Sequence, residues 1–519
     1  MTRNYLDILA ETIRSNWDAP ALTDFYLTED GSAQDTSRGN HYTYGEMYAE
    51  LCHVAELLTS LGLQKGDHIA ICGANSAHWV IAYLAIAKMQ GVSVTVMHTL
   101  MPDEIARLVN FSDAKALFTD EDLWLELKSL PLPQVENIIS LENFESLASG
   151  TSIIASSASI ETSASSASSP SIVSFPSSSP DDLAMICFTS GTSGNPKGVM
   201  LSSANVSNNV YQAFLLYPQE CNTAFFSFLP FTHMAGLIGD MLSQLSFGKN
   251  IHILQEAITK YNIISGIKNI APYMFVSVPA IFSTEANSRK ENILEDLSSS
   301  CKLIFMGGSK IEKNVEQKIV DSKIPLSLIY GQTETGASIS ISPYKQHRLG
   351  SCGKIVSGMT ARISPAGEIL VKGENVMLGY YKDPEATARK IDSDGWLHTG
   401  DKGHLDEDGY LYVEGRLEQD IIVLPNGENI RLDNIESLIN ALPEVSESIV
   451  LARDGKLVAI VVPQITNHQS QITNTDLRRM IMRTINPQLP LYSQLYDVEI
   501  TDTPLARTEK QTLKRYLYK

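Results

Sequence analysis

One segment combines glycines, hydroxyl groups and a lysine in the way that phosphate-binding loops do. It runs from Thr189 to Gly198, reads TSGTSGNPKG, and follows a short apolar run. Glycines let backbone N–H groups approach a phosphate closely, hydroxyls donate further hydrogen bonds, and Lys197 adds positive charge. The spacing fits neither GxGxxG nor GxxxxGK, since Pro196 stands where the latter needs glycine. The segment is a candidate cradle for a polyphosphate, with an ordinary polar hairpin as the alternative.

Five more short segments follow this loop along the chain. They are LPFTHMAG at 229–236, GGS at 307–309, YGQTETG at 330–336, GWLHTGD at 395–401, and Gly415-Arg416. With the loop, they resemble in their order the motifs of the adenylate-forming (AMP-binding) superfamily, which includes acyl-CoA synthetases, luciferases and peptide-synthetase adenylation domains. The resemblance extends from about Tyr42 to the end, and bacterial fatty acid–CoA ligases are the expected subgroup. It implies that ATP activates a carboxylic acid as acyl-AMP, with release of pyrophosphate, before the acyl group passes to a thiol.

The same resemblance assigns the ATP site. Glu334 would hold Mg²⁺ on the phosphates, as a hard oxygen ligand should. Tyr330 would stack on adenine, Asp401 would accept hydrogen bonds from the ribose hydroxyls, and Arg416 would reach the same sugar. An ordinary turn is the alternative for Asp401. The other residues implied for ATP or AMP are Thr189, Ser190, Gly191, Thr192, Ser193, Gly194, Lys197, Gly308, Ser309, Gly331, Gln332 and Thr333.

Catalytic groups are implied at two further places. His233 would line the acyl pocket beside the reacting carboxylate, although a lone histidine is more often structural. One lysine near the C-terminus would bridge the carboxylate and the α-phosphate, because a positive charge offsets the repulsion between two anions. Lys510 is the preferred candidate and Lys514 is the competitor, since Glu509 replaces the glycine that the family usually has there.

For the second half-reaction, the family rotates its small C-terminal domain about a hinge. Glu418 stands at the hinge position, where relatives often have lysine or aspartate. Gly427 would line the tunnel for the pantetheine arm of CoA, and an Asn-Gly turn is the alternative for it. ATP, Mg²⁺ and CoA are therefore the expected cofactors and co-substrates.

The nature of the acid is less constrained by the sequence. No acidic residue stands between Phe231 and Asp240 to hold an amino group, which disfavours an amino acid. Apolar residues around His233 favour a medium- or long-chain fatty acid, and an aromatic acid is next. An acyl carrier protein could replace CoA as acceptor, since both present the same arm. A nucleotide-binding regulatory pseudoenzyme is the alternative of a different class.

The elements that must hold these residues alternate in type. Helical periodicity over 44–63 and 77–89 is interleaved with strand-like runs at 68–72 and 92–97, and further buried strands are expected at 183–188, 302–306 and 326–330. We predict an α/β fold. It comprises a large N-terminal domain (1–415) of layered α/β subdomains plus a β-rich subdomain, a hinge at 416–418, and a small mobile α+β C-terminal domain (419–519).

Composition narrows the class of protein. The net charge of −19 opposes attraction to nucleic acid, and six scattered cysteines suggest neither a disulfide framework nor a zinc site. No apolar run reaches membrane-spanning length, so we expect a cytoplasmic protein that at most contacts a membrane peripherally. Residues 151–180, of which 14 are serine, predict a flexible surface loop.

Overall fold

The structure is a computed structural model of the 519-residue chain. It describes residues 3–28, 33–35, 37–147, 169–189, 196–216, 223–282, 293–308, 311, 313–416, 421–423, 429–453, 455–464, 473–505 and 517–518. The chain divides into two compact units, one formed by residues 1–98, 102–189 and 197–415, and the other mainly by residues 416–519. The predicted α/β fold, with a large N-terminal and a small C-terminal domain, is confirmed.

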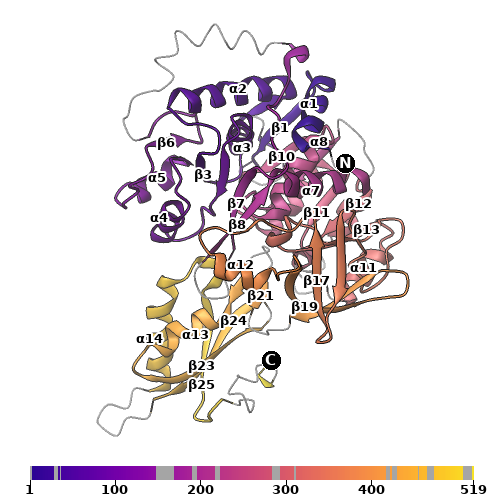
Figure 1. Cartoon of the computed structure of the whole chain (residues 1–519). Helices are drawn as coiled ribbons and strands as arrows, with labels where there is room; N and C mark the ends of the chain where they lie inside the picture. The colour runs from indigo at the N-terminus through magenta and orange to yellow at the C-terminus, as the bar shows by residue number, and fades with distance from the viewer. Residues whose placement is uncertain are drawn as a thin grey trace. The chain divides into compact units, whose positions relative to one another are not determined.

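The largest sheet of the larger unit has the strand order β18-β8-β7-β4-β3-β5-β6. Figure 1 labels four of these strands, β8, β7, β3 and β6. Strands β6, β5, β3, β4 and β7 are parallel, whereas β8 runs antiparallel to β7 and β18 runs antiparallel to β8. The bounds are β3 His68–Cys72, β4 Val92–Thr95, β5 Ala116–Thr119, β6 Asn137–Ser140, β7 Leu183–Thr189, β8 Lys197–Ser202 and β18 Gly379–Tyr380.

Helix α3 (Ala77–Lys88) packs between this sheet and α2 (Tyr44–Ser60). Ser76 caps α3 by accepting a hydrogen bond from the Trp79 N–H, and the helix is buried from its first residue to Ile86. A helix that is apolar all round belongs in a core, which explains why α3 lies between two layers.

Two more sheets complete the α/β part of the larger unit. One has the order β2-β1-β10-β9, and the other has the order β11-β12-β13-β14-β15, in which β11, β12 and β13 are parallel. The bounds are β1 Pro20–Phe25, β2 His41–Thr43, β9 Ala224–Ser227, β10 Asn250–Leu254, β11 Met274–Ser277, β12 Leu303–Met306, β13 Leu326–Tyr330, β14 Ser340–Ile341 and β15 Lys354–Ile355.

A four-stranded sheet of order β16-β17-β19-β20 forms the β-rich part of the larger unit. Strands β16 (Met359–Ile363) and β17 (Glu368–Gly373) form an antiparallel pair, and β17 pairs antiparallel with β19 (Leu397–Leu405). Strand β20 spans Leu411–Arg416. This sheet supplies Asp401 to the candidate site.

The smaller unit has its own hydrophobic core. Its sheet has the order β23-β24-β25, with β23 antiparallel and β25 parallel to β24. Apolar residues of this sheet and of two helices form the core, among them Ile435, Ile481 and Val461. The bounds are α13 Leu432–Asn440, α14 Asn474–Ile485, β21 Ile421–Val423, β22 Asn429–Arg431, β23 Val445–Arg453, β24 Lys456–Pro463 and β25 Leu495–Ile500.

The remaining helices surround the sheets of the larger unit. Among the described residues, no helix is both long enough and apolar enough to cross a membrane. The bounds are α1 Tyr5–Ser15, α4 Pro102–Phe111, α5 Glu121–Leu127, α7 Ser203–Leu216, α8 Ser243–Ser246, α9 Lys260–Ile270, α10 Ile293–Ser298, α11 Lys313–Asp321 and α12 Pro384–Lys390.

The end of the serine-rich stretch is packed, which differs from the predicted flexible loop. Val173 is buried, and its carbonyl accepts a hydrogen bond from the Arg14 guanidinium. The Ser174 N–H donates to the Tyr48 hydroxyl, and Phe175 packs edge-on against the Tyr48 ring. The prediction was wrong for this part because these two apolar side chains anchor it, while residues 151–168 lie outside the described residues.

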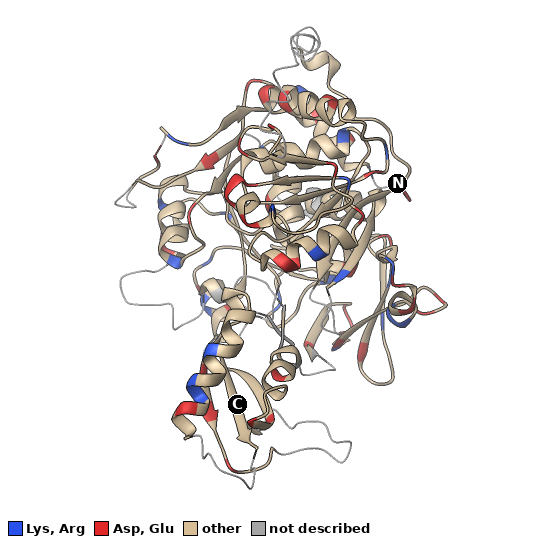
Figure 2. Cartoon of the chain, turned by 90° about the vertical axis from the view of Figure 1, so that its left-hand side faces the viewer, with Lys and Arg blue, Asp and Glu red and all other residues tan. Residues whose placement is uncertain are grey.

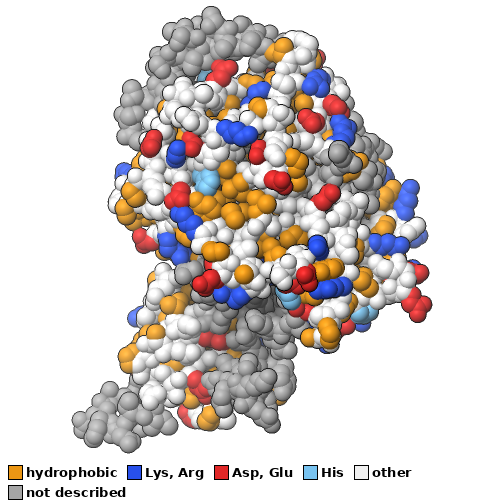
Figure 3. Space-filling view, in the orientation of Figure 1, with side chains coloured by type: hydrophobic (Ala, Val, Ile, Leu, Met, Phe, Trp, Pro, Cys, Tyr) orange, Lys and Arg blue, Asp and Glu red, His pale blue; other side chains and the backbone are white. Residues whose placement is uncertain are grey.

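Charged side chains of both signs are interspersed over the larger unit. Figure 2 shows acidic and basic residues on many of its elements, and Figure 3 shows both kinds across its visible face.

Candidate active site

The candidate phosphate loop connects the two strands of a hairpin. Strands β7 and β8 pair antiparallel, and Thr189 at the end of β7 lies opposite Lys197 at the start of β8. A hairpin brings both ends of its connection together, so Thr189 and Lys197 flank the loop on facing strands. The residues between them that were predicted to bind phosphate, Ser190, Gly191, Thr192, Ser193 and Gly194, lie outside the described residues.

Two predicted adenine-side segments follow neighbouring parallel strands. Gly307 and Gly308 come directly after β12, and the segment from Gly331 to Thr333 comes directly after β13. Because β12 and β13 are parallel, their carboxyl ends lie at the same edge of the sheet, where open α/β sheets bind ligands. A Cβ on Gly331 would collide with the backbone carbonyl of Ala337, so the tight turn after β13 requires glycine here.

Glu334 lies in a single turn of 3₁₀-helix, Thr333–Thr335. Gln332 caps the turn, because its backbone N–H donates to the Thr335 hydroxyl, which donates back to the Gln332 carbonyl. Gly336 ends the turn with a positive φ of 61°, a conformation that favours glycine. The turn presents Glu334 part-exposed just beyond the sheet edge.

Tyr380 links Glu334 to the strand that begins at Lys197. Its hydroxyl donates a 2.7 Å hydrogen bond to Oε1 of Glu334, and the Lys197 ammonium lies 4.9 Å from the centre of its ring. Burial raises the pKa of Tyr380, and the Glu334 charge raises it further. The phenol therefore stays protonated at neutral pH and acts as the donor to the carboxylate.

Asp401 is brought to the adenine-side segment by the sheet of β19. Its Oδ2 accepts a 2.7 Å hydrogen bond from the Tyr330 hydroxyl, although the two residues are 71 positions apart. The side-chain amide of Gln332 donates to the carbonyl of Thr399, two residues before Asp401. The end of β13 and strand β19 are therefore joined by two hydrogen bonds beside the predicted ribose ligand.

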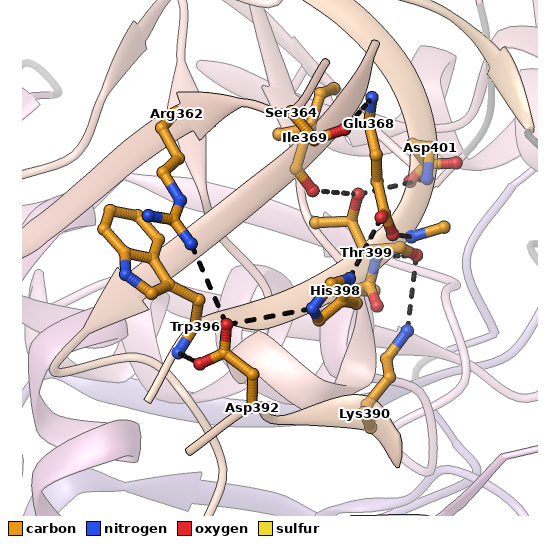
Figure 4. Close-up of polar contacts among 12 residues, drawn as sticks. Arg362, Ser364, Glu368, Ile369, Lys390, Asp392, Trp396, His398, Thr399 and Asp401 are labelled. Carbon is orange, nitrogen blue, oxygen red and sulfur yellow. Dashed lines mark hydrogen bonds and ion pairs between the residues drawn. The ribbon is translucent and has the colours of Figure 1, made fainter. Parts of the chain in front are cut away.

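The backbone before Asp401 is itself fixed from two sides, as Figure 4 shows. The Thr399 hydroxyl donates to the Ile369 carbonyl at 2.7 Å and accepts from the Asp401 N–H at 3.0 Å. The Glu368 carboxylate accepts from the Gly400 N–H and contacts the His398 imidazole, both at 3.0 Å. These contacts tie β19 to β17 and set the direction in which the chain reaches Asp401.

A second cluster in Figure 4 holds the turn that leads into β19. Asp392 accepts a hydrogen bond from the Trp396 N–H at 2.8 Å, and the Arg362 guanidinium lies 4.2 Å from the centre of the Trp396 ring. The hydrogen bond from the Trp396 N–H is the main cause of the lowered pKa of Asp392. The carboxylate is thereby kept charged where it caps the turn.

His233 lies two residues before the π-helical segment Ala235–Leu242. Its Nδ1 accepts a hydrogen bond from the Ala235 N–H at 3.2 Å, which leaves the proton on Nε2. Burial lowers the pKa of His233, so the ring is neutral at physiological pH. Within the described chain, no hydrogen bond or ion pair joins His233 to another predicted site residue.

Two family models match the chain. The model described as AMP-binding enzyme matches residues 9–381, and that described as AMP-binding enzyme C-terminal domain matches residues 419–518. The chain belongs to the AMP-binding enzyme family. It is accordingly a ligase of this family, as the order of the six motifs predicted.

Curated members of the family with related sequences differ in the acid that their names state. The chain is 23% identical to a long-chain-fatty-acid–CoA ligase of Rattus norvegicus, over 88% of this chain and 76% of the relative. It is 26% identical to 4-coumarate–CoA ligase 4 of Arabidopsis thaliana, over 87% of this chain and 82% of the relative. A probable CoA ligase of Humulus lupulus is 28% identical, over 81% and 78% of the two chains.

Solved structures of the family share the fold. An amide bond synthetase from Marinactinospora thermotolerans superposes with a TM-score of 0.77 at 21% identity, covering 99% of both chains. The o-succinylbenzoate CoA synthetase of Bacillus subtilis superposes with a TM-score of 0.75 at 23% identity, covering 99% of this chain and 98% of that one.

The structure brings some predicted site residues together and leaves others undescribed. Lys197 and Glu334 meet through Tyr380, and Tyr330 contacts Asp401 directly. The side chain of Arg416, at the end of β20, is not among those described. The predicted residues that lie outside the described part of the chain, besides those of the phosphate loop, are Ser309, Glu418, Gly427, Lys510 and Lys514.

Sequence reasoning missed the residues that support the AMP-binding motifs. Asn209 on α7 is buried, donates to the Thr335 carbonyl, and accepts from both the N–H and the hydroxyl of Ser338. Asn205, one turn earlier, donates to the carbonyls of Glu374 and Val376. Asparagines four positions apart on a helix indicate a polar face. Their hydrogen-bond partners are more than 120 residues away in the sequence, so no local pattern identifies them.

Proposed function

We propose that the protein is an AMP-forming acid–CoA ligase. It converts a carboxylic acid, preferentially a medium- or long-chain fatty acid, to acyl-AMP with release of pyrophosphate, and then to acyl-CoA with release of AMP. Two contacts carry the proposal. Lys197, at the start of β8, and Glu334, just past the end of β13, both contact Tyr380. Tyr330, at the end of β13, donates a hydrogen bond to Asp401 on β19. Membership of the AMP-binding family supports it.

Glu334 fits the role of a magnesium ligand. Its carboxylate is part-exposed just past a strand end, and Mg²⁺ in nucleotide sites is usually bound by one or two carboxylates, substrate phosphates and water. Among the described residues, no group of three or more His, Cys, Asp or Glu side chains could hold a metal ion alone. A single carboxylate that binds the ion together with the ATP phosphates agrees with both points. The ion would neutralise negative charge on those phosphates.

The first half-reaction joins two anions. A carboxylate oxygen of the acid forms a bond to the α-phosphorus of ATP while the bond from that phosphorus to pyrophosphate breaks. Lys197, flanking the phosphate loop, offsets negative charge on the departing pyrophosphate. Lys510 or Lys514 is the proposed bridge between the carboxylate and the α-phosphate.

Tyr330 and Asp401 serve the nucleoside in this proposal. The Asp401 carboxylate accepts hydrogen bonds from the ribose hydroxyls, and the Tyr330 hydroxyl holds that carboxylate at 2.7 Å. The ring of Tyr330 and the backbone of Gly308 and Gly331 flank the adenine. Arg416 and Ser309 complete the proposed nucleotide set.

His233 faces the acid in the proposed mechanism. As a neutral ring with its proton on Nε2, it can donate one hydrogen bond to the substrate carboxylate without adding charge. In the second half-reaction, the CoA sulfur forms a bond to the acyl carbon, AMP leaves, and the thiol loses its proton. Glu418 is the proposed hinge between domains 1–415 and 419–519, and Gly427 the proposed lining of the thiol tunnel.

A fatty acid is preferred because apolar side chains surround the His233 segment. Phe231, Met234 and Leu237 are almost fully buried beside it, and each methylene of a buried chain contributes about 0.8 kcal/mol. The relation to a long-chain-fatty-acid–CoA ligase supports this choice. A cytoplasmic location remains part of the proposal.

An aromatic acid is the second candidate. Phe228, directly after β9, and Phe275, the second residue of β11, stack at a centroid distance of 5.6 Å, and aromatic rings favour offset stacking partners. The similarity to 4-coumarate–CoA ligases points in the same direction.

A panel assay tests the proposal and separates its alternatives. Pyrophosphate release is measured with ATP, Mg²⁺ and acids from acetate to oleate plus benzoate and 4-coumarate, each with and without CoA. The expected result is release with fatty acids that rises with chain length, and acyl-CoA when CoA is present. E334Q should abolish release, whereas E385Q, which removes an exposed carboxylate on α12, should not.

Each other outcome of the panel overturns part of the proposal. Release with aromatic acids alone selects the second candidate. Release without acyl-CoA points to an acyl carrier protein as acceptor. ATP binding without release for any acid contradicts the ligase and favours a regulatory pseudoenzyme.

A further inference from the structure

Tyr380 lies on a two-residue strand that is fixed to the exit of the phosphate hairpin. Strand β18 pairs with β8, so that Tyr380 lies opposite Val199 and Gly379 opposite Met200. The pairing is continued on both sides, because the Leu378 N–H donates to the Met200 carbonyl and the Tyr381 N–H donates to the Gly198 carbonyl. Tyr380 is therefore held in register with the strand whose first residue is Lys197.

The same short segment also holds Glu334. The Tyr380 hydroxyl donates to Oε1 of Glu334, and the Met377 N–H donates to the backbone carbonyl of Glu334 at 2.9 Å. One contact fixes the side chain and the other fixes the backbone. Among the described residues, Tyr380 is the one whose side chain forms a hydrogen bond to the Glu334 carboxylate.

Tyr380 is well placed to hold its neighbours rigidly. Its side chain is buried to 6% exposure, and its backbone N–H donates to the Thr387 hydroxyl at 2.8 Å. The Lys197 ammonium lies over its ring, and the negative face of an aromatic ring attracts a cation. One aromatic side chain therefore contacts the flanking lysine of the phosphate loop and the proposed metal ligand.

We propose that Tyr380 is a positioning residue, which orients the Glu334 carboxylate for the metal–nucleotide complex and couples it to the strand that starts at Lys197. The inference rests on the proposed function, in which Glu334 binds Mg²⁺. A ligating carboxylate needs a hydrogen-bonded partner to fix its rotamer, and loss of such a partner typically costs 10- to 100-fold in metal affinity. Holding Oε1 with a neutral phenol fixes the carboxylate without neutralising its charge.

The test measures metal binding rather than turnover. Mn²⁺ replaces Mg²⁺, and its free concentration is followed by electron paramagnetic resonance with each full-length variant in excess over ATP, so that no unbound nucleotide competes for the ion. Y380F removes only the hydroxyl and keeps the ring under Lys197. We expect about a tenfold weaker Mn²⁺ affinity in the ATP complex, with ATP affinity in EDTA unchanged.

Tyr381 offers a matched control. Its hydroxyl donates to Oδ2 of Asp113 at the same distance of 2.7 Å, so Y381F removes one tyrosine–carboxylate hydrogen bond from the adjacent residue. Y381F should leave Mn²⁺ affinity unchanged. Thermal melts of both variants show whether each is folded.

A double-mutant cycle separates positioning from a general structural effect. If Tyr380 acts through Glu334, the double variant of Y380F and E334Q binds Mn²⁺ no more weakly than E334Q alone. Losses of Mn²⁺ affinity that add in the double variant overturn the inference. So does an unchanged Mn²⁺ affinity in Y380F when E334Q loses the metal. If E334Q itself retains full Mn²⁺ affinity, the proposed function of Glu334 fails instead.

Discussion

At the scale of single residues, separate carboxylates are proposed to bind the nucleoside and the metal. Asp401 is buried to 6% exposure and accepts from Tyr330, whereas Glu334 is part-exposed and accepts from Tyr380. Each carboxylate is thus held by a phenol that adds no charge. The two proposed sites can be tested separately, because binding of AMP in EDTA would probe only the nucleoside site.

Substitution of Asp401 tests the proposed sugar contact. D401N keeps the size of the side chain and removes its charge, so the hydrogen bonds from the ribose lose their ionic component. We expect AMP affinity, measured by calorimetry in EDTA, to fall about tenfold to a hundredfold, as expected for loss of charge-assisted hydrogen bonds.

Two further variants complete that experiment. Y330F should weaken AMP binding by a smaller factor, because it removes only the hydroxyl that holds Asp401. E334Q serves as the control that leaves AMP affinity in EDTA unchanged. Equal AMP affinity in D401N and the natural chain would remove Asp401 from the site.

The carboxyl group of Asp120, directly after β5, should make the free energy of unfolding depend on pH. Burial raises its pKa to about 6 from 3.8, with Glu142 and Asp122 adding to the rise. An acid whose pKa is higher in the folded state binds its proton more tightly there, so its contribution to stability is fully present below pH 3.8. This contribution is lost as the pH rises to about 6. The loss is about 3 kcal/mol at most.

The variant D120N has no proton to lose and should not show this dependence. Unfolding midpoints at pH 4, 5, 6 and 7 should show the natural chain losing stability relative to D120N up to about pH 6, with a constant difference above it. E126Q removes an exposed carboxylate on α5, the helix that begins directly after Asp120, and should follow the natural chain. Parallel curves for D120N and the natural chain would contradict the prediction.

At the scale of elements, helix α7 fixes the turn that carries Glu334. The Asn209 side chain donates a hydrogen bond to Thr335, the last residue of that turn, and accepts one from Ser338, three residues beyond it. N209A leaves the buried Ser338 N–H and hydroxyl without their acceptor. We expect a loss of about 2–4 kcal/mol in the free energy of unfolding and a raised KM for ATP.

Gln212, one turn further along α7, provides the control for this prediction. Its amide is also buried but donates to the Ser357 carbonyl, away from the Glu334 turn. Q212A should lower stability and leave the KM for ATP unchanged. If N209A and Q212A change KM alike, α7 supports the fold in general and not the turn.

The elements also show what the sequence can predict. Strands β3 and β13 were predicted with their observed bounds, because short apolar runs that end near glycine read directly as buried strands. Strand β18 was missed because two residues carry no periodicity, and its pairing with β8 joins segments about 180 residues apart. Tyr380 was missed with it, since only that pairing brings its hydroxyl to Glu334.

At the scale of the whole molecule, the chain has two units with separate cores. The core of the smaller unit is formed by residues between Ile430 and Val498, and the larger unit has its own core from Tyr5 to Leu411. Units that bury their own apolar residues can fold by themselves. The catalytic lysine is proposed to lie in the smaller unit, whereas the proposed nucleotide contacts Tyr330, Glu334 and Asp401 lie in the larger one.

Truncation tests this division of roles. A chain that ends at residue 418 keeps Arg416 and should remain folded, with AMP affinity within a few-fold of the full chain, because the larger unit has its own core. The rate of acyl-AMP formation should fall at least a hundredfold, as expected when a charge-stabilising group is absent.

In the full chain, either K510A or K514A should reproduce this loss, and the other substitution should not. Undiminished acyl-AMP formation by the truncated chain would contradict the proposed lysine.

The most direct test of the central proposal follows an oxygen atom. The acid is supplied with both carboxylate oxygens as ¹⁸O, and the products of the reaction with ATP and CoA are analysed by mass spectrometry. If the carboxylate attacks the α-phosphorus and CoA then displaces AMP, each AMP carries one ¹⁸O and each acyl-CoA carries the other. Label in inorganic phosphate together with ADP, or unlabelled AMP, would contradict the acyl-AMP pathway.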